Sequence, residues 1–221
     1  NTEDYVSWNW LAGGGSGSSN TDGSINTTST SANVDAGFSI STYTGNATAG
    51  ATIGHGLSKA PDIIWVKERG AVSGWMCYHS SNTSEPETEE LNLEVTEATQ
   101  DVANIWNDTA PTATVFSLGN NAVVNGNTNT FVAYCWHGVE GYSKFGVYTG
   151  NGSTSDGPFI YTGFRPAWLM VKSTSFVDAW IVFDTKRNVT GVYTNPLDDT
   201  LAPAITNAES VGDSNVKVDF Y

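Results

Sequence analysis

The chain has 221 residues, of which 39% are hydrophobic and 12% aromatic, enough to fill the core of one good-sized domain or two small ones. Only 14% of the residues are charged, so uncharged Thr, Ser, Asn and Gly must keep the surface soluble, as is typical of extracellular and virion β-proteins. The formal net charge of −14 repels phosphate backbones and anionic lipid, which argues against a nucleic-acid partner. We expect no membrane partner either, because no apolar run approaches the roughly 20 residues that a membrane helix needs.

Two segments of contrasting composition precede residue 36. Within residues 1–12, Tyr5–Trp10 alternates in polarity as a strand does. Residues 13–35 consist mostly of Gly, Ser, Thr and Asn, a composition that predicts a linker or long loop with nothing buried. We therefore expect a first strand joined by a polar linker to the remainder of the chain.

From residue 36 onward nearly every periodic segment favours β-structure. Five segments are short, rich in aromatic or β-branched residues, and separated by Gly, Asn and Pro. They are Phe38–Thr44, Ile63–Lys67, Trp75–His79, Thr114–Leu118 and Phe131–Trp136. This spacing predicts an all-β antiparallel sandwich of jelly-roll or concanavalin-like type. Between these segments we expect a strand around Leu91–Val95 and two helical turns at most within Thr99–Trp106.

The chain also resembles itself at an offset of 105 residues. Tyr43–Trp75 and Tyr148–Trp180 share nine identities in 33 ungapped positions, where about two are expected from residue frequencies of roughly 6%. This match predicts two β pseudo-repeats, residues 36–141 and residues 142–221, the second without its last hairpin. The residues assigned to the structural core of the repeats are Trp75, Trp180, Pro61, Pro166 and Trp136.

The first segment has a counterpart inside the first repeat. Tyr5–Trp10 matches Phe131–Trp136 position by position as aromatic, Val, small, aromatic, polar or Cys, and Trp. The segment is therefore interpreted as the last strand of a preceding repeat in a longer protein, or as a strand supplied to the second repeat within one chain or between neighbours. The candidate residues of this assembly strand are Tyr5, Val6, Trp8 and Trp10.

Chemically reactive side chains are few and poorly spaced for a catalytic or metal site. Cys77 and Cys135 permit one disulfide, although two buried apolar thiols are the simpler interpretation. His79 and His137 follow them by two residues, so direct pairing of the two strands would gather all four side chains into one patch. No cysteine or histidine spacing matches a zinc site, and the acidic loops do not spell a calcium-binding motif. We expect no catalytic residue and no cofactor, and a structural calcium ion stays open without a motif that supports it.

Aromatic side chains are the better candidates for ligand contacts. Trp106 lies in the least regular segment, where an indole can form an exposed platform for a sugar ring. Tyr43 and Tyr148 begin the two repeated Tyr-Thr-Gly-Asn turns and are the further candidates. Carbohydrate binding is accordingly one functional hypothesis.

Several longer motifs resemble a family of uncharacterised domains in the virion proteins of tailed phages, many from marine bacteria and cyanobacteria. The resemblance extends from Trp8 to about Tyr221, and its motifs include Gly37–Asn46, Gly54–Leu57, Ala60–Ile64, Trp106–Pro111, Lys144–Gly152, Gly157–Phe159 and Thr162–Pro166. It implies a non-enzymatic structural or adhesive protein on the virion surface, as a tail fibre, head fibre or capsid decoration. The implied partners are copies of the chain, other virion proteins and host surface glycans.

Three alternatives to this virion function stay open at the level of the sequence. They are a carbohydrate-binding module that recognises host surface glycans, a secreted adhesin or extracellular filament subunit, and a polysaccharide depolymerase. The last is the enzymatic contender, since 23 acidic residues leave room for a pair of carboxylates.

Overall fold

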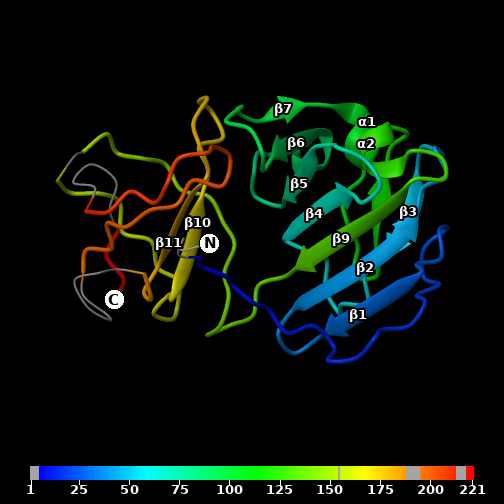
Figure 1. The fold of residues 1–221 in the computed structure, drawn as a ribbon, viewed down its shortest axis with the longest axis horizontal. Coiled ribbons are helices and arrows are strands. Elements are labelled where there is room, and N and C mark those ends of the chain that lie inside the picture. The colour runs from blue at the N-terminus through cyan, green and yellow to red at the C-terminus, as the bar shows by residue number, and fades with distance from the viewer. Residues whose placement is uncertain (1–4, 154, 188–194, 213–217) are drawn as a thin grey trace.

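A computed structural model describes residues 5–153, 155–187, 195–212 and 218–221. These residues form antiparallel strands with two single-turn α-helices and one 3-10 turn, so the all-β class predicted from the sequence is confirmed (Figure 1). The strands are β1 (Ser29–Asn33), β2 (Phe38–Thr44), β3 (Ala51–Gly54), β4 (Ile63–Glu68), β5 (Trp75–His79), β6 (Glu89–Asn92), β7 (Gln100–Asp101), β8 (Val115–Leu118), β9 (Thr130–Trp136), β10 (Trp168–Val171) and β11 (Ile181–Asp184), and the helices are α1 (Ala103–Trp106), α2 (Ala122–Asn125) and the 3-10 turn η1 (Pro86–Thr88).

Seven strands build the main sheet in the order β1-β2-β9-β4-β5-β6-β7. The longest pairing runs antiparallel between β2 and β9, from Phe38 opposite Trp136 to Thr44 opposite Thr130. A second layer, the β3–β8 pair with α1 and α2, covers one face of this sheet. The result is a two-layer, sandwich-like arrangement whose interior is the main core.

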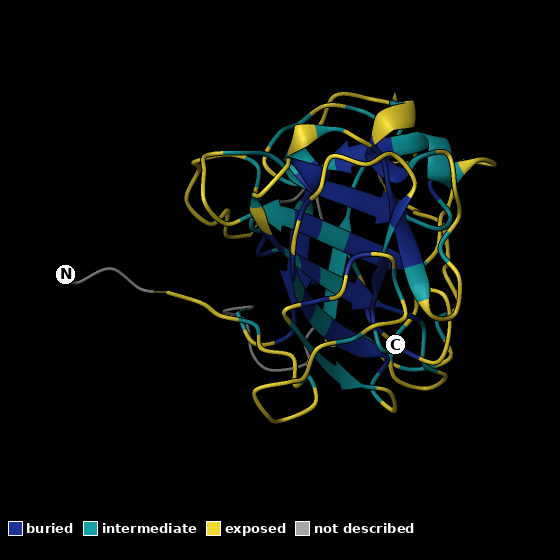
Figure 2. Cartoon of the chain, turned by 90° about the vertical axis from the view of Figure 1, so that its right-hand side faces the viewer, coloured by how far each residue is buried: buried dark blue, intermediate teal, exposed yellow. Residues whose placement is uncertain are grey.

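Side chains that alternate along each strand divide between the two faces of the main sheet. On β9, Phe131 and Cys135 point into the main core, whereas Tyr134 and Trp136 lie on the opposite face, called here the second face. Figure 2 shows the buried strands at the centre with exposed loops around them. The side chains of the main core that are least exposed include Tyr43, Ile53, Ile64, Val66, Trp106, Phe116, Leu118, Val124 and Phe131.

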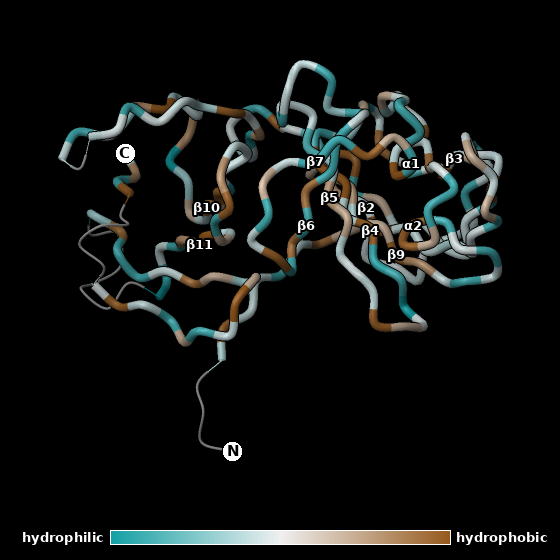
Figure 3. Tube along the Cα trace, turned by 90° about the horizontal axis from the view of Figure 1, so that it is seen from above, coloured by the Kyte–Doolittle hydropathy of each residue, from teal (hydrophilic) through white to brown (hydrophobic). Residues whose placement is uncertain are grey.

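The second unit of the molecule is built around the β10–β11 hairpin, which lies beside the main sheet (Figures 1 and 3). Trp180 and Met170 from this hairpin region pack with Cys77 and Leu91 of the second face, so the two units share an apolar contact. Residues 154, 188–194 and 213–217 of the predicted second repeat, and residues 1–4 of the predicted first segment, lie outside the described residues.

Two hairpins have the same register at the offset found in the sequence. β4–β5 pairs Ile63 with His79, and β10–β11 pairs Trp168 with Asp184, which are the residues 105 positions later. The remaining pairs follow in step through Val171 opposite Ile181. The equal registers of these two hairpins agree with the pseudo-repeat at this one place, and the repeat over the rest of the chain stays a prediction.

The five strands expected between Phe38 and Trp136 are confirmed as β2, β4, β5, β8 and β9. The predicted strand at Leu91–Val95 is displaced, because β6 covers Glu89–Asn92. The predicted helix is shorter than expected, since residues 100–101 form β7 and only Ala103–Trp106 are helical.

Tyr5–Trp10 forms no strand in this structure, unlike the expectation from its alternating polarity. Residues 5–12 have no strand assignment, and the contacts of this segment are made by side chains. Trp10 packs against Trp136 and Trp168, and the indole Nε1 of Trp8 donates to the Asp184 carboxylate. The alternating polarity of this segment therefore identifies the side chains that hold it in place, although its backbone is not paired with a strand in this structure.

The predicted linker at residues 13–35 is also wrong in part, because it contains β1 and two buried side chains. Ile25 and Thr27 are 8% and 2% exposed. Hydroxyl groups replace apolar packing here, since the Oγ1 atom of Thr30 lies 2.9 Å from both Thr27 Oγ1 and Ser41 Oγ. A segment rich in Ser and Thr can thus pair at the sheet edge through its polar side chains.

Candidate functional site

Four aromatic side chains form a continuous row across the second face of the main sheet. Trp75 and Tyr134 have ring centroids 6.2 Å apart and planes inclined by 24°. Tyr134 and Trp136 are also 6.2 Å apart, at 21°, and Trp136 stacks on Phe38 at 4.9 Å and 28°. We call these four residues the aromatic row.

The row follows from strand order and register. β9 contributes Tyr134 and Trp136, two residues apart and therefore on the same face. Phe38 is directly opposite Trp136 on β2, and Trp75 comes from β5, on the far side of β4. Trp65 of β4 fills the space between the strands and meets the Trp136 ring edge-on at 4.7 Å. Each ring is thereby held by packing before any ligand arrives.

Burial decreases along the row. Phe38 is 4% exposed and Trp136 is 9% exposed, whereas Trp75 and Tyr134 are partly exposed. Lys67 lies beside them, paired in register with Trp75, and its ammonium donates to the carbonyl oxygens of Glu68 and Ala71. Solvent therefore reaches the row at its Trp75 and Tyr134 end. Such a surface can stack on the apolar face of a sugar ring.

Two of the three aromatic residues predicted to contact a ligand are buried in the main core. Trp106 is 2% exposed and packs edge-on against Tyr78, so the expected exposed platform at Trp106 is wrong. Tyr43 is 1% exposed, and its hydroxyl donates to the Val124 carbonyl at 2.7 Å. Tyr148 is 47% exposed but is not a member of the aromatic row.

The residues assigned to the repeat core have different degrees of burial. Pro61, Trp136 and Trp180 are buried, as expected. Trp75 and Pro166 are partly exposed. The two equivalent tryptophans, Trp75 and Trp180, thus have different environments, and only Trp180 is a core residue.

The proposed patch of cysteines and histidines does not form. β4 separates β5 from β9, so the strands that carry Cys77 and Cys135 are not neighbours. Both cysteines are free and buried, as the simpler interpretation predicted, but Cys77 packs on the second face and Cys135 in the main core. Burial raises the pKa of the Cys77 thiol to about 12 against a smaller opposing effect of Trp65, and burial also raises the pKa of Cys135.

Two histidines hold structural positions in neutral form. His55 is fully buried, its Nδ1 accepts from the Leu57 amide, and its Nε2 faces the Thr112 carbonyl, so the proton is on Nε2. Burial lowers the pKa of His55 and of His79 from the ordinary value. Within the described part of the chain, no group of three or more His, Cys, Asp or Glu side chains is arranged to hold a metal ion.

The most strongly paired charges belong to the second unit. Asp184 is a buried residue, 4% exposed. Its carboxylate accepts hydrogen bonds from Trp8 Nε1, from the backbone amides of Lys186 and Arg187, and from Arg187 Nε at 2.6 Å. Arg187 also pairs with Glu209 and lies over the Trp8 ring. Burial opposes ionisation of Asp184, but these partners together hold its pKa below the ordinary value. This cluster fastens the N-terminal segment to β11.

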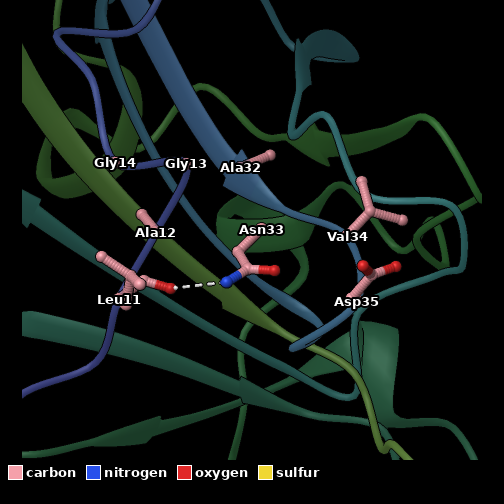
Figure 4. Close-up of a pocket in the computed structure, with 8 residues that line it drawn as sticks. All are labelled: Leu11, Ala12, Gly13, Gly14, Ala32, Asn33, Val34 and Asp35. Atoms are coloured by element: carbon pink, nitrogen blue, oxygen red, sulfur yellow. Dashed lines mark hydrogen bonds between the residues drawn. The ribbon is translucent and has the colours of Figure 1, made fainter.

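A hollow of about 350 Å³ lies between the N-terminal segment and the end of β1 (Figure 4). Its lining is Leu11, Ala12, Gly13, Gly14, Ala32, Asn33, Val34 and Asp35. The Asn33 amide donates to the Leu11 carbonyl across it at 3.2 Å. With one carboxylate and few polar groups in its lining, the hollow is better explained as the anchor of residues 11–13 than as a ligand site.

No described helix is both long enough and apolar enough to span a bilayer. The family model described as a domain of unknown function, DUF7483, matches residues 1–221. The chain belongs to this DUF7483 family. No curated protein and no solved structure matches the chain.

Part of the aromatic row could be predicted from the sequence. Alternation within Phe131–Trp136 places Tyr134 and Trp136 on one face of a strand, and this signal was present in the sequence. The meeting of Tyr134 with Trp75 depends on the position of β4 between β5 and β9, which no local pattern specifies.

Proposed function

We propose that this protein is a non-enzymatic structural and adhesive component of a phage virion surface, and that it attaches to host surface glycan through the aromatic row. The resemblance of several sequence motifs to those of tailed-phage virion domains supports the location. The partly exposed rings of Trp75 and Tyr134 carry the adhesive part of the proposal. Fibre and capsid decoration are both compatible with this function.

The chemistry of the row favours a neutral glycan. Aromatic faces bind the C–H face of a pyranose ring without needing charge on the ligand, and rings fixed by neighbours lose little entropy on binding. The net charge of −14 disfavours acidic polysaccharides at moderate ionic strength.

Binding to a glycan array, followed by calorimetric titration of each retained glycan, tests the adhesive function. We expect Trp75→Ala and Tyr134→Ala each to weaken binding by roughly tenfold or more, the loss of about 1–2 kcal/mol of stacking. Tyr148→Ala is the matched control, because it removes an exposed tyrosine outside the row. Equal binding by all three variants, or a stronger loss at Tyr148, contradicts a site on the row.

The location on the virion has a separate test. Antibody against the purified chain should label intact phage particles in electron micrographs, at fibres or on the capsid surface. Detection in the host secretome with no labelled particle would instead favour the secreted adhesin. Release of oligosaccharides from host capsule by the purified protein would favour the depolymerase.

A further inference from the structure

The two equivalent hairpins differ in what flanks them. β4 has a strand on each side, β5 and β9. Among the described residues, β10 pairs with β11 alone, so its second edge has no strand partner. An open edge presents unpaired backbone amides and carbonyls that readily accept a further strand.

The repeat specifies which residue should lie beside the open edge. β9 pairs with β4 through Trp136 opposite Ile63, and the position 105 residues after Ile63 is Trp168. Because Tyr5–Trp10 matches Phe131–Trp136 residue by residue, Trp10 is the counterpart of Trp136. A strand formed by this segment would therefore place Trp10 opposite Trp168.

The structure already brings that pair together. The rings of Trp10 and Trp168 are in edge-to-face contact, with centroids 5.6 Å apart and planes at 86°. This contact is independent of the sequence match, since it comes from the position of residues 10–13 in space. The Leu11 carbonyl accepts from Asn33, and the Gly13 amide donates to Ser31 Oγ at 3.0 Å, which holds the segment at this place.

Beyond Trp10 the segment diverges from β10. Trp8 reaches the Asp184 carboxylate at the end of the hairpin, and Tyr5 and Val6 are 79% and 41% exposed. Figure 2 shows this part of the chain leading away from the sheets. The side chains of Tyr5 and Val6 are therefore exposed, and the second edge of β10 carries no strand among the described residues.

We propose that Tyr5–Trp10 closes onto the open edge of β10 of the same chain as an antiparallel strand, and that this closure exchanges the hydrogen bond between Trp8 and Asp184 for backbone pairing. With Trp10 opposite Trp168, the register continues with Asn9 opposite Leu169, Trp8 opposite Met170 and Ser7 opposite Val171. The strand takes the place beside β10 that β9 takes beside β4. The same chain supplies it because Trp10 of this chain already lies against Trp168 of β10.

A pair of engineered cysteines tests the register. Residues directly opposite in an antiparallel pair have Cα atoms about 4.5–5.5 Å apart, within the range of a disulfide, whereas a shift of two residues increases the separation to about 7–8 Å. The test variant is Ser7→Cys with Val171→Cys, and the matched control is Ser7→Cys with Leu169→Cys. The buried thiols of Cys77 and Cys135 have raised pKa values and should not compete.

We expect an intrachain disulfide in the 7/171 variant, formed at least roughly tenfold faster than in the 7/169 control, as read by peptide mapping and non-reducing electrophoresis. Equal rates in the two variants, or no disulfide in either, overturn the proposal. A disulfide that links two chains only would also overturn it and identify a second copy as the source of the strand.

Hydrogen exchange of the unmodified chain gives an independent measurement. A strand on the open edge should protect the amides of β10 that do not bond to β11, and this protection should appear in the unmodified chain. Unprotected β10 edge amides in the unmodified chain contradict the strand.

Discussion

The β4–β5 and β10–β11 hairpins have the same register in very different surroundings. In each, a lysine near the end of the first strand donates from Nζ to the carbonyl of the following residue at 2.7 Å, Lys67 to Glu68 and Lys172 to Ser173. Yet Ile64 is fully buried in the first hairpin, while Leu169 at the equivalent position is only partly buried. Local sequence is therefore sufficient to reproduce the hairpin and its turn contacts, but the burial of its side chains depends on neighbouring strands.

What stabilises the two hairpins differs accordingly. The first is enclosed by β9, β6 and the β3–β8 layer, so most of its stability comes from apolar packing. The second relies on a charged cluster around Asp184 and on a small apolar cluster formed by Phe183, Leu197 and Phe220. Substitutions at equivalent positions should separate these two sources of stability.

The largest effect is expected at the end of the second hairpin. Asp184→Asn should destabilise the second unit by about 3–5 kcal/mol, because it removes the charge that accepts from the nearly buried Arg187 guanidinium, from Trp8 and from two backbone amides. His79 is the equivalent residue of the first hairpin and is partly exposed, so His79→Asn should cost about 1 kcal/mol or less. Urea unfolding followed by near-ultraviolet dichroism measures both. Equal losses would show that the charged cluster has no special importance.

A smaller difference is expected between equivalent apolar residues within the strands. Ile64→Ala should cost about 2–5 kcal/mol, since it opens a cavity in the main core. Leu169→Ala should cost about 1 kcal/mol, because the side chain is partly exposed and the site can collapse. Comparable midpoint shifts in thermal unfolding would contradict the assignment of packing stability to the first hairpin.

Much of the first unit was predictable from sequence because its strands alternate apolar and polar residues. Phe38–Thr44 and Trp75–His79 were predicted with the bounds that the structure has. β1 was missed because its side chains make contacts through hydroxyl groups, as between Thr30 and Ser41, and hydroxyl groups leave no apolar pattern to mark the strand that pairs with β2.

The candidate site was less predictable because exposure is decided by the second layer. Trp106 belongs to an irregular segment, which favoured exposure, but α1 places it under η1 and β6 in the main core. Trp75 begins a buried strand, which favoured packing, but no described residue covers it fully. Both errors have the same cause, since a strand's sequence does not show which element lies over its face.

The equivalent tryptophans offer a conservative comparison with a still smaller effect. Trp180→Phe should cost about 1–3 kcal/mol, because it leaves the Asn92 carbonyl without the indole Nε1 that donates to it at 2.8 Å. Trp75→Phe should change stability by about 0.5 kcal/mol or less, since the ring is partly exposed. Chemical denaturation of the two variants provides the measurement. A larger loss at Trp75 would place that ring in the core after all.

The smallest expected effects are in the pH dependence of the two hairpin ends. Burial lowers the pKa of His79 from 6.5, so the neutral ring, whose Nδ1 accepts from the Ser81 amide, is favoured in the folded state. Its stabilising contribution is complete above pH 6.5 and is lost as the pH falls below that value. Asp184 also has a lowered pKa, so its contribution is complete above the ordinary value of 3.8 and is lost only as the pH falls through the lower folded value.

The first hairpin should therefore respond to acid at a higher pH than the second. In an NMR titration from pH 7.5 downward, the Ser81 amide should begin to shift only below pH 6.5, while the Lys186 and Arg187 amides should stay unchanged until the pH has fallen below 3.8. His79→Gln should abolish the first change alone. Simultaneous changes at both ends would mean that the two hairpins respond to acid as one cooperative unit, and the contrast between packed and charge-stabilised hairpins would fail.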